Sequence, residues 1–251
     1  MAEFTSRFGA QAAEYRSFRP IWPAQVFARI LERVPSPRRR ALDLGAGTGL
    51  VALRLLESFE EVIAVEPDEK MLAQLGPGPA RVRARAEDAV FEAASADLVT
   101  AGNAFHWMDG AVVCARAAGW LRPGGVLAVF RYDPPHAAVG PLRDLLAEEY
   151  GVRWRDHVHA RLRDPDYTRR TVSESAFGAR LDASWIPNEL TLSMSELIGF
   201  CRSTSYGGGY ARSLPDPEAY WHDLERRIRG RAGNGPFTLD FAVELLLAVK
   251  D

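Results

Sequence analysis

The sequence of 251 residues contains little cysteine, no long apolar run and almost no excess of charge. Its two cysteines, Cys114 and Cys201, lie far apart in apolar segments, which argues against a disulfide framework and favours a reducing compartment. No apolar run reaches the roughly 18 residues of a membrane-spanning helix, and the first residues lack the apolar core of a signal peptide. We therefore expect a cytoplasmic protein.

The charge balance also excludes some partners. A formal net charge of -2 and a pI near 6.2 give no overall field that would attract nucleic acid or an anionic membrane. A basic stripe with interleaved aromatic residues, typical of nucleic-acid binding, is absent. We expect a small-molecule substrate, no nucleic-acid or membrane partner, and a monomer or homodimer. Neither His157 nor His159 has a further His or Cys nearby, so we expect no metal.

Strand and helix signals alternate over residues 23–132, which predicts a parallel sheet covered on both faces. A helix over 23–34 precedes five strands and their connecting helices. Further strands are expected near 190–192 and 237–250, and helices near 193–201 and 216–230. The five expected strands cover residues 41–44, 62–66, 81–85, 96–102 and 126–132.

Three alternating glycines follow the first strand in the segment ALDLGAGTGL, residues 41–50. Gly45 can adopt backbone angles closed to other residues, Gly47 lets the main chain approach a ligand, and Gly49 allows close helix packing. A helix is expected to open at Thr48. The spacing G-x-G-x-G differs from the G-x-G-x-x-G of dinucleotide-binding turns, which disfavours an NAD-dependent dehydrogenase. A glycine-rich turn without a ligand is the plainer alternative.

Acidic residues lie at the ends of the second and third expected strands. In a doubly wound sheet the ligand lies beyond the carboxyl ends of the strands. Glu66 ends the second strand, 21 positions after Gly45, where a carboxylate can accept hydrogen bonds from two ribose hydroxyls. Ala86, Glu87 and Asp88 follow the third strand.

Together with Glu66, the segment DLGAGTG resembles motif I of the class I S-adenosylmethionine (SAM) dependent methyltransferases. The resemblance implies a Rossmann-like, doubly wound, mostly parallel seven-stranded α/β sheet. It also implies SAM as cofactor and S-adenosyl-L-homocysteine as product. The implied cofactor-binding residues are Asp43, Gly45, Ala46, Gly47, Gly49, Glu66, Pro67, Ala86, Glu87, Asp88 and Asn103.

A second resemblance is narrower. The segment AFHWMD of residues 104–109, the early RPIWP of residues 19–23 and the late STSY of residues 203–206 are similar to the trans-aconitate methyltransferase-like proteins of the methyltransferase type 11 branch. By this resemblance Asn103 lies beside the methionine moiety, and His106 and Trp107 face the methyl group. Tyr15 is a third candidate catalytic residue. His106 could equally be a hydrogen-bonded core histidine.

One residue departs from the pattern of the family. Arg85 stands where many relatives have an acid that reads the adenine amino group, so either Glu87 or Asp88 takes over that contact. The alternative stays open.

The expected organisation is a single methyltransferase domain over 1–251. An aromatic N-terminal arm over 1–22 would form a lid, although the same aromatics could simply pack on the domain. Residues 23–132 would form the SAM-binding core, 133–182 an inserted helical cap, and 183–251 the C-terminal part of the core.

The expected function is SAM-dependent methyl transfer to a small-molecule acceptor, at an oxygen of a carboxylate or hydroxyl. The cap contributes seven arginines against four acids over residues 153–180, and guanidinium groups suit carboxylate recognition. The alternatives are a SAM-binding protein without methyl transfer and N- or C-methylation of a larger natural product.

Overall fold

The computed structural model describes residues 12–132 and 140–251, which form two compact units. Within the described residues, the first unit takes in 12–20, Tyr132–Arg163 and Pro187–Ala242. The second unit consists of Ile21–Arg131, Asp164–Ile186 and Val243–Asp251. The expected cap and C-terminal segments therefore do not coincide with the units. The single domain, the lid and the cap stay predictions, and residues 1–11 of the expected lid lie outside the described residues.

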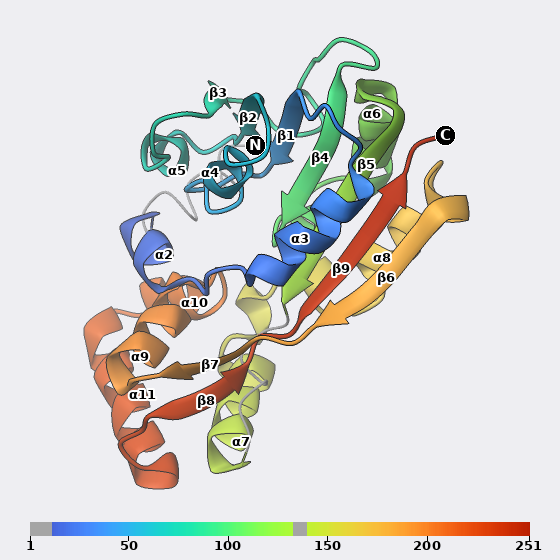
Figure 1. The fold of residues 1–251 in the computed structure, drawn as a ribbon. Helices are drawn as coiled ribbons and strands as arrows, with labels where there is room; N and C mark the ends of the chain where they lie inside the picture. The colour runs from blue at the N-terminus through green and yellow to red at the C-terminus, as the bar shows by residue number, and fades with distance from the viewer. Residues whose placement is uncertain (1–11, 133–139) are drawn as a thin grey trace. The chain divides into compact units, whose positions relative to one another are not determined.

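The second unit is built on a seven-stranded sheet of order β3-β2-β1-β4-β5-β9-β6 (Figure 1). β1 pairs in parallel with both β2 and β4, β2 with β3, and β4 with β5, whereas β6 and β9 are antiparallel. The predicted mostly parallel seven-stranded sheet is confirmed. Its strands are β1 (Arg40–Leu44), β2 (Glu61–Val65), β3 (Ala80–Val82), β4 (Ala96–Gly102), β5 (Leu121–Tyr132), β6 (Leu181–Ile186) and β9 (Val243–Val249).

Helices cover both faces of this sheet, which is why its inner strands read as continuous apolar runs. Figure 1 shows α3 in front of the sheet and α6 and α8 behind it. Asp109 accepts a hydrogen bond from the Val112 amide at 3.2 Å and so begins α6. The helices of this unit are α3 (Ala24–Arg33), α4 (Ala52–Leu55), α5 (Glu69–Ala73), α6 (Gly110–Trp120) and α8 (Tyr167–Ser173), with short 3-10 turns at Phe105–Trp107 and Gly178–Arg180.

Two sequence expectations about elements are wrong. The helix expected to open at Thr48 is only the short α4, because residues 46–51 are used in turns such as the Gly49 amide donating to the Ala46 carbonyl at 2.8 Å. The single last strand expected over 237–250 is two strands, β8 and β9. Asp240 causes the break, since its carboxylate accepts from the Ala242 amide at 2.8 Å and turns the chain.

The first unit is mainly helical. β7 and β8 form a separate antiparallel pair, so the strand expected near 190–192 exists outside the large sheet. Ser193 and Glu196 form the predicted capping box of α9, and Asp216 caps α11, which begins at Pro217. The elements are α2 (Ala12–Phe18), α7 (Gly140–Glu148), α9 (Met194–Ser203), α10 (Gly207–Arg212), α11 (Pro217–Ala232), β7 (Glu189–Leu192) and β8 (Phe237–Asp240), with short turns at Glu149–Arg153, Arg155–His157 and Ala160–Leu162.

No helix among the described residues is long and apolar enough to cross a membrane.

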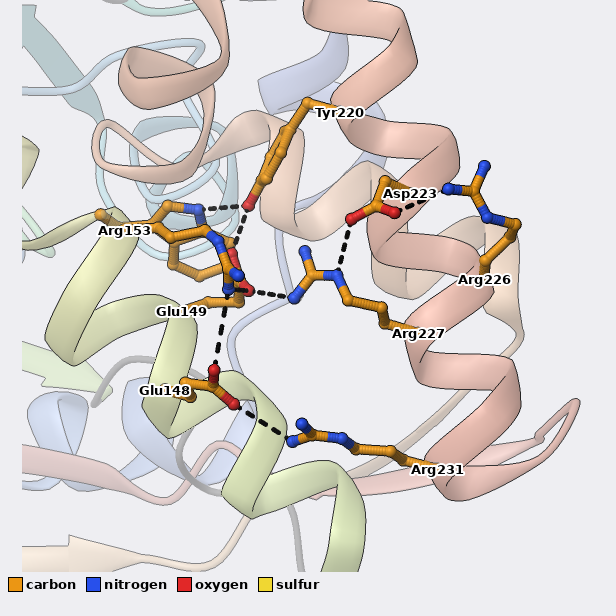
Figure 2. Close-up of polar contacts among 9 residues, drawn as sticks. Glu148, Glu149, Arg153, Tyr220, Asp223, Arg226, Arg227 and Arg231 are labelled. Carbon is orange, nitrogen blue, oxygen red and sulfur yellow. Dashed lines mark hydrogen bonds and ion pairs between the residues drawn. The ribbon is translucent and has the colours of Figure 1, made fainter.

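A buried carboxylate links the helices of the first unit (Figure 2). Glu149 is fully buried, and its Oε1 forms ion pairs with Arg153 and Arg227. Its Oε2 accepts the Tyr220 hydroxyl at 2.6 Å, and the Trp154 indole N–H donates to that hydroxyl at 2.7 Å. Burial and the Glu149 carboxylate raise the pKa of Tyr220, which keeps the phenol a donor. Glu149 begins a π-turn, because the Trp154 amide donates to its carbonyl at 2.7 Å.

Removing this charge should destabilise the first unit. We expect Glu149→Gln to lower the free energy of unfolding by about 3 kcal/mol, because Arg153 and Arg227 lose a buried counter-ion. Urea unfolding followed by tryptophan fluorescence measures the loss. Glu148→Gln is the matched control: its side chain is 43% exposed beside Arg153 and Arg231, and the expected loss is below about 1 kcal/mol. Equal losses in the two variants would contradict the role of burial.

Candidate functional site

The strand order creates a switch point next to β1. From β1 the chain builds the sheet first through β2 and β3 and then, on the other side, through β4 and β5. In such sheets ligands bind beyond the carboxyl ends of the strands at this point. The ends of β1, β2 and β4 carry Asp43 with the glycine turn, Glu66 and Asn103. The structure therefore brings the main cofactor candidates to one edge of the second unit's sheet.

The three glycines of the turn have different surroundings. Gly45 has φ +64°, and a Cβ there would lie 2.6 Å from the Ala104 Cβ. A Cβ on Gly49 would lie 1.9 Å from the Leu75 Cδ1. Gly47 has φ +57°, and a Cβ on it would meet only the Met71 methyl group, at 3.3 Å. Gly45 and Gly49 are thus required by packing, whereas a side chain at Gly47 would meet only the end of one flexible side chain.

Glu66 is buried and holds the turn directly. Its Oε2 accepts from the Gly47 amide and its Oε1 from the Asp68 amide, both at 2.9 Å. Burial raises the pKa of Glu66, and the two amides act in the opposite direction. Pro67 follows, and Asp68 caps α5 by accepting from two of its backbone amides. Because each carboxylate oxygen has two acceptor positions, Glu66 retains capacity for further donors.

Two polar atoms near the turn have no hydrogen-bond partner among the described residues. The Thr100 hydroxyl donates to Asp43 Oδ1 at 2.8 Å, but Asp43 Oδ2 is buried without a partner. Burial raises the pKa of Asp43 to about 7, and the Thr100 hydrogen bond opposes that rise. The Thr48 hydroxyl is likewise buried and unpaired. Thr48 was not among the predicted site residues; its place between two motif glycines is the signal that could have indicated it.

The residues after β3 form a charged turn. Ala86 is buried and Asp88 is exposed. Glu87 accepts from the Arg85 guanidinium at 2.9 Å and from the Asp109 amide at 2.8 Å. Burial acts to raise the pKa of Glu87, but Arg85 and the backbone amides bring it below its usual value.

Asn103, after β4, has a left-handed backbone with φ +50°. Among residues other than glycine this conformation is uncommon, although asparagine adopts it most readily, and such residues cluster at functional sites. The Asn103 amide donates to the Phe130 carbonyl at 2.8 Å, which fixes this conformation.

The segment after Asn103 forms the 3-10 turn Phe105–Trp107. His106 is buried, and its ring lies 5.2 Å from the Trp107 ring, centroid to centroid. Both belong to the second unit, whereas Tyr15 belongs to α2 of the first unit.

No group of three or more His, Cys, Asp or Glu residues that could hold a metal occurs in the described part of the chain. His157 lies against the Tyr210 ring at 6.0 Å, and the His159 Nδ1 accepts from the Arg161 amide at 3.3 Å.

Comparisons with known proteins agree with this geometry. Residues 42–129 match the family described as "Methyltransferase domain". An uncharacterised methyltransferase of Mycobacterium tuberculosis is 37% identical over 125 residues, which cover 49% of this chain and 50% of the relative. A "probable S-adenosylmethionine-dependent methyltransferase" of Saccharomyces cerevisiae is 26% identical over 165 residues, covering 61% and 56%. The chain thus spans about half the length of the curated relatives it matches.

A solved structure described as a type II methyltransferase, from Anaeromyxobacter dehalogenans, covers 93% of this chain and 97% of its own. Its TM-score is 0.73 and its sequence is 26% identical. The family match falls on β1 to β5, the part that carries the glycine turn, Glu66 and Asn103. Residues 42–129 therefore match a methyltransferase domain, and the described fold is similar to that of the solved type II methyltransferase.

Proposed function

We propose that this chain binds SAM at the end of β1 and transfers its methyl group to an oxygen of a small-molecule acceptor, leaving S-adenosyl-L-homocysteine. The observation that carries the proposal is the glycine turn held by Glu66 beside two unpaired buried oxygens, Asp43 Oδ2 and the Thr48 hydroxyl. An unpaired buried polar atom is costly unless a ligand or water satisfies it. The residues present therefore fit a polar cofactor.

Individual residues have distinct roles in this proposal. Glu66 uses its remaining acceptor positions for the ribose hydroxyls, as its place after β2 favours. Asp43 with Gly45, Ala46, Gly47 and Gly49 forms the cradle, and Pro67 directs the chain away from it. Ala86 with either Glu87 or Asp88 binds adenine, and Asn103 lies beside the methionine moiety.

Catalysis in this proposal depends mainly on alignment. When bound, SAM supplies a methyl group already activated on a positively charged sulfur. Holding the reacting atoms in line is worth about 7–11 kcal/mol in well-oriented systems, whereas a general base adds only about 10²–10⁴-fold. Trp107 would shape the acceptor's surroundings and exclude water, and Tyr15 of the first unit is the third candidate catalytic residue. His106 would orient the acceptor, and would also remove its proton where the acceptor is a hydroxyl.

The acceptor is proposed as a carboxylate or hydroxyl of a small molecule. The slightly acidic chain offers no basic field for nucleic acid. The likeness to trans-aconitate methyltransferase-like proteins in the segment AFHWMD supports an acid as acceptor. A cytoplasmic monomer or homodimer remains part of the proposal.

The cofactor role of Glu66 can be tested by binding. We expect Glu66→Gln to weaken SAM binding by about 1.5–3 kcal/mol, roughly ten- to a hundredfold, because a charge-assisted acceptor is lost. Titration calorimetry with SAM and S-adenosyl-L-homocysteine measures the effect. Glu69→Gln, a side chain 71% exposed at the start of α5, is the control and should bind normally. Unchanged affinity in Glu66→Gln, or NADH binding in place of SAM, would refute the proposal.

The buried carboxyl of Asp43 predicts a specific pH dependence. Its pKa is raised from 3.8 to about 7, so between these values the folded chain holds a proton that the unfolded chain has released. The stabilisation is complete below pH 3.8 and is lost as the pH rises through about 7. Relative to Asp43→Asn, we expect the wild type to lose roughly 3 kcal/mol of unfolding free energy between pH 5 and pH 8. Urea unfolding at both pH values measures it; a constant difference would contradict the prediction.

The role of His106 depends on the acceptor. With a hydroxyl acceptor we expect kcat/KM of the wild type to fall as the imidazole becomes protonated at acid pH. His106→Gln should then lose that dependence and about 10²–10⁴-fold in rate. With a carboxylate acceptor both profiles should be nearly flat. His222→Gln, an exposed histidine on α11, controls for the substitution itself. Identical rates and profiles in wild type and His106→Gln would eliminate His106 as a catalytic group.

A further inference from the structure

An arginine in the first unit has neutral hydrogen-bond partners. Arg19 follows α2, where its amide donates to the Tyr15 carbonyl at 3.1 Å. Its Nη1 donates to the Tyr132 hydroxyl at 3.2 Å and its Nη2 to the Ser203 carbonyl at 3.1 Å. Both partners are uncharged, so they position the guanidinium without neutralising it.

Aromatic rings surround the same guanidinium. Its Cζ lies 4.5 Å from the centroid of the Tyr15 ring and 5.7 Å from that of the Phe200 ring. These faces attract a cation and hold its plane, but they also remove water from it. The Arg19 Nε is buried and has no hydrogen-bond partner among the described residues.

Two buried carboxylates of this chain are neutralised by arginines. Glu244 is paired with Arg131, and Glu149 with Arg227. For Arg19, the hydrogen-bond partners found among the side chains and backbone groups that the structure describes are the Tyr132 hydroxyl and the Ser203 carbonyl, and neither is a carboxylate. A partly buried guanidinium of this kind is costly unless an anion completes it.

The geometry of the remaining donors indicates the missing group. A guanidinium has five N–H donors, and two of those of Arg19 are used. The N–H of Nε and the second N–H of a neighbouring Nη form a planar fork, which matches two oxygens of one carboxylate or phosphate. We propose that Arg19 is the anchor of an oxyanion-binding site in the first unit, which takes a small molecule carrying a carboxylate or phosphate.

This site lies within the first unit and goes beyond the proposed function: its ligand is a small molecule that carries a carboxylate or phosphate. The arginines of residues 153–180 are less suited to this role, because most of them already form ion pairs with an Asp or Glu of this chain. Their ion pairs within each unit are Arg153 with Glu149, Arg169 with Glu244, Arg170 with Asp164 and Arg180 with Asp251.

The unpaired Nε offers a direct test in the wild-type protein. Citrate and inorganic phosphate are titrated without SAM at constant ionic strength, and the Arg19 Nε–Hε resonance is followed by ¹H–¹⁵N NMR. The resonance is assigned to Arg19 because it is missing from the spectrum of Arg19→Lys. We expect a saturable shift with at least one of the two anions. Saturation by citrate alone identifies a carboxylate ligand, and saturation by phosphate alone a phosphate ligand. No saturable shift with either anion overturns the proposal.

Variants give a second, independent readout. Arg19→Gln should weaken binding of the anion at least tenfold, and Arg19→Lys, which keeps the charge but lacks the planar fork, should also weaken it. Arg16→Gln, an exposed arginine on the same helix, should bind as the wild type does. Thermal unfolding checks that each variant is folded. A folded Arg19→Gln that binds the anion with wild-type affinity overturns the proposal.

The two proposals fail separately. SAM titration of the wild type tests the β1 site without any anion. Normal SAM binding with no response of Arg19 overturns only the oxyanion site, whereas a response of Arg19 without SAM binding overturns only the cofactor proposal.

Discussion

The turn after β1 can form only because Gly45 and Gly49 lack side chains. A single methyl group at either position would collide with Ala104 or Leu75. The first contact sets the turn against the end of β4, and the second sets it against the chain after α5. The position of Glu66 follows from the same constraint, since its carboxylate accepts from the Gly47 amide. The arrangement of the candidate site therefore depends on two close packing contacts, that of Gly45 with Ala104 and that of Gly49 with Leu75.

Buried carboxylates in the chain fall into two classes. Glu149 and Glu244 are neutralised by arginines, and such fully paired groups hold helices and strands together. Glu66 accepts from two backbone amides, and Asp43 leaves one oxygen unpaired. Burial raises the pKa of Asp43 to about 7. A charge that the fold surrounds without neutralising keeps a capacity for interaction with a ligand. The unpaired groups, not the best-paired ones, therefore mark the functional candidates.

The same reasoning applies to cations. The first unit contains both kinds of arginine: Arg227 pairs with Glu149 and Asp223, whereas Arg19 has a phenol, a carbonyl and aromatic rings. Composition alone directs attention to the arginine-rich residues 153–180. Most of those guanidinium groups already have acidic partners. The number of arginines in a segment is therefore a poorer guide to a binding site than whether each arginine has a partner of opposite charge.

The sequence by itself determined the features that local chemistry fixes. The glycine turn, the strands of residues 41–132, the caps at Ser193 and Asp216 and the acid after β2 could be predicted, because backbone angles, apolar runs and cap residues act within a few positions. Only the tertiary structure decided which distant segments meet. Three features each depend on residues far along the chain: the pairing of β8 with β7 and of β9 with β6, the burial of Glu149 beside Arg227, and the neutral partners of Arg19. No local pattern specifies such a partner, because hydrophobic periodicity says which face is buried but not what covers it.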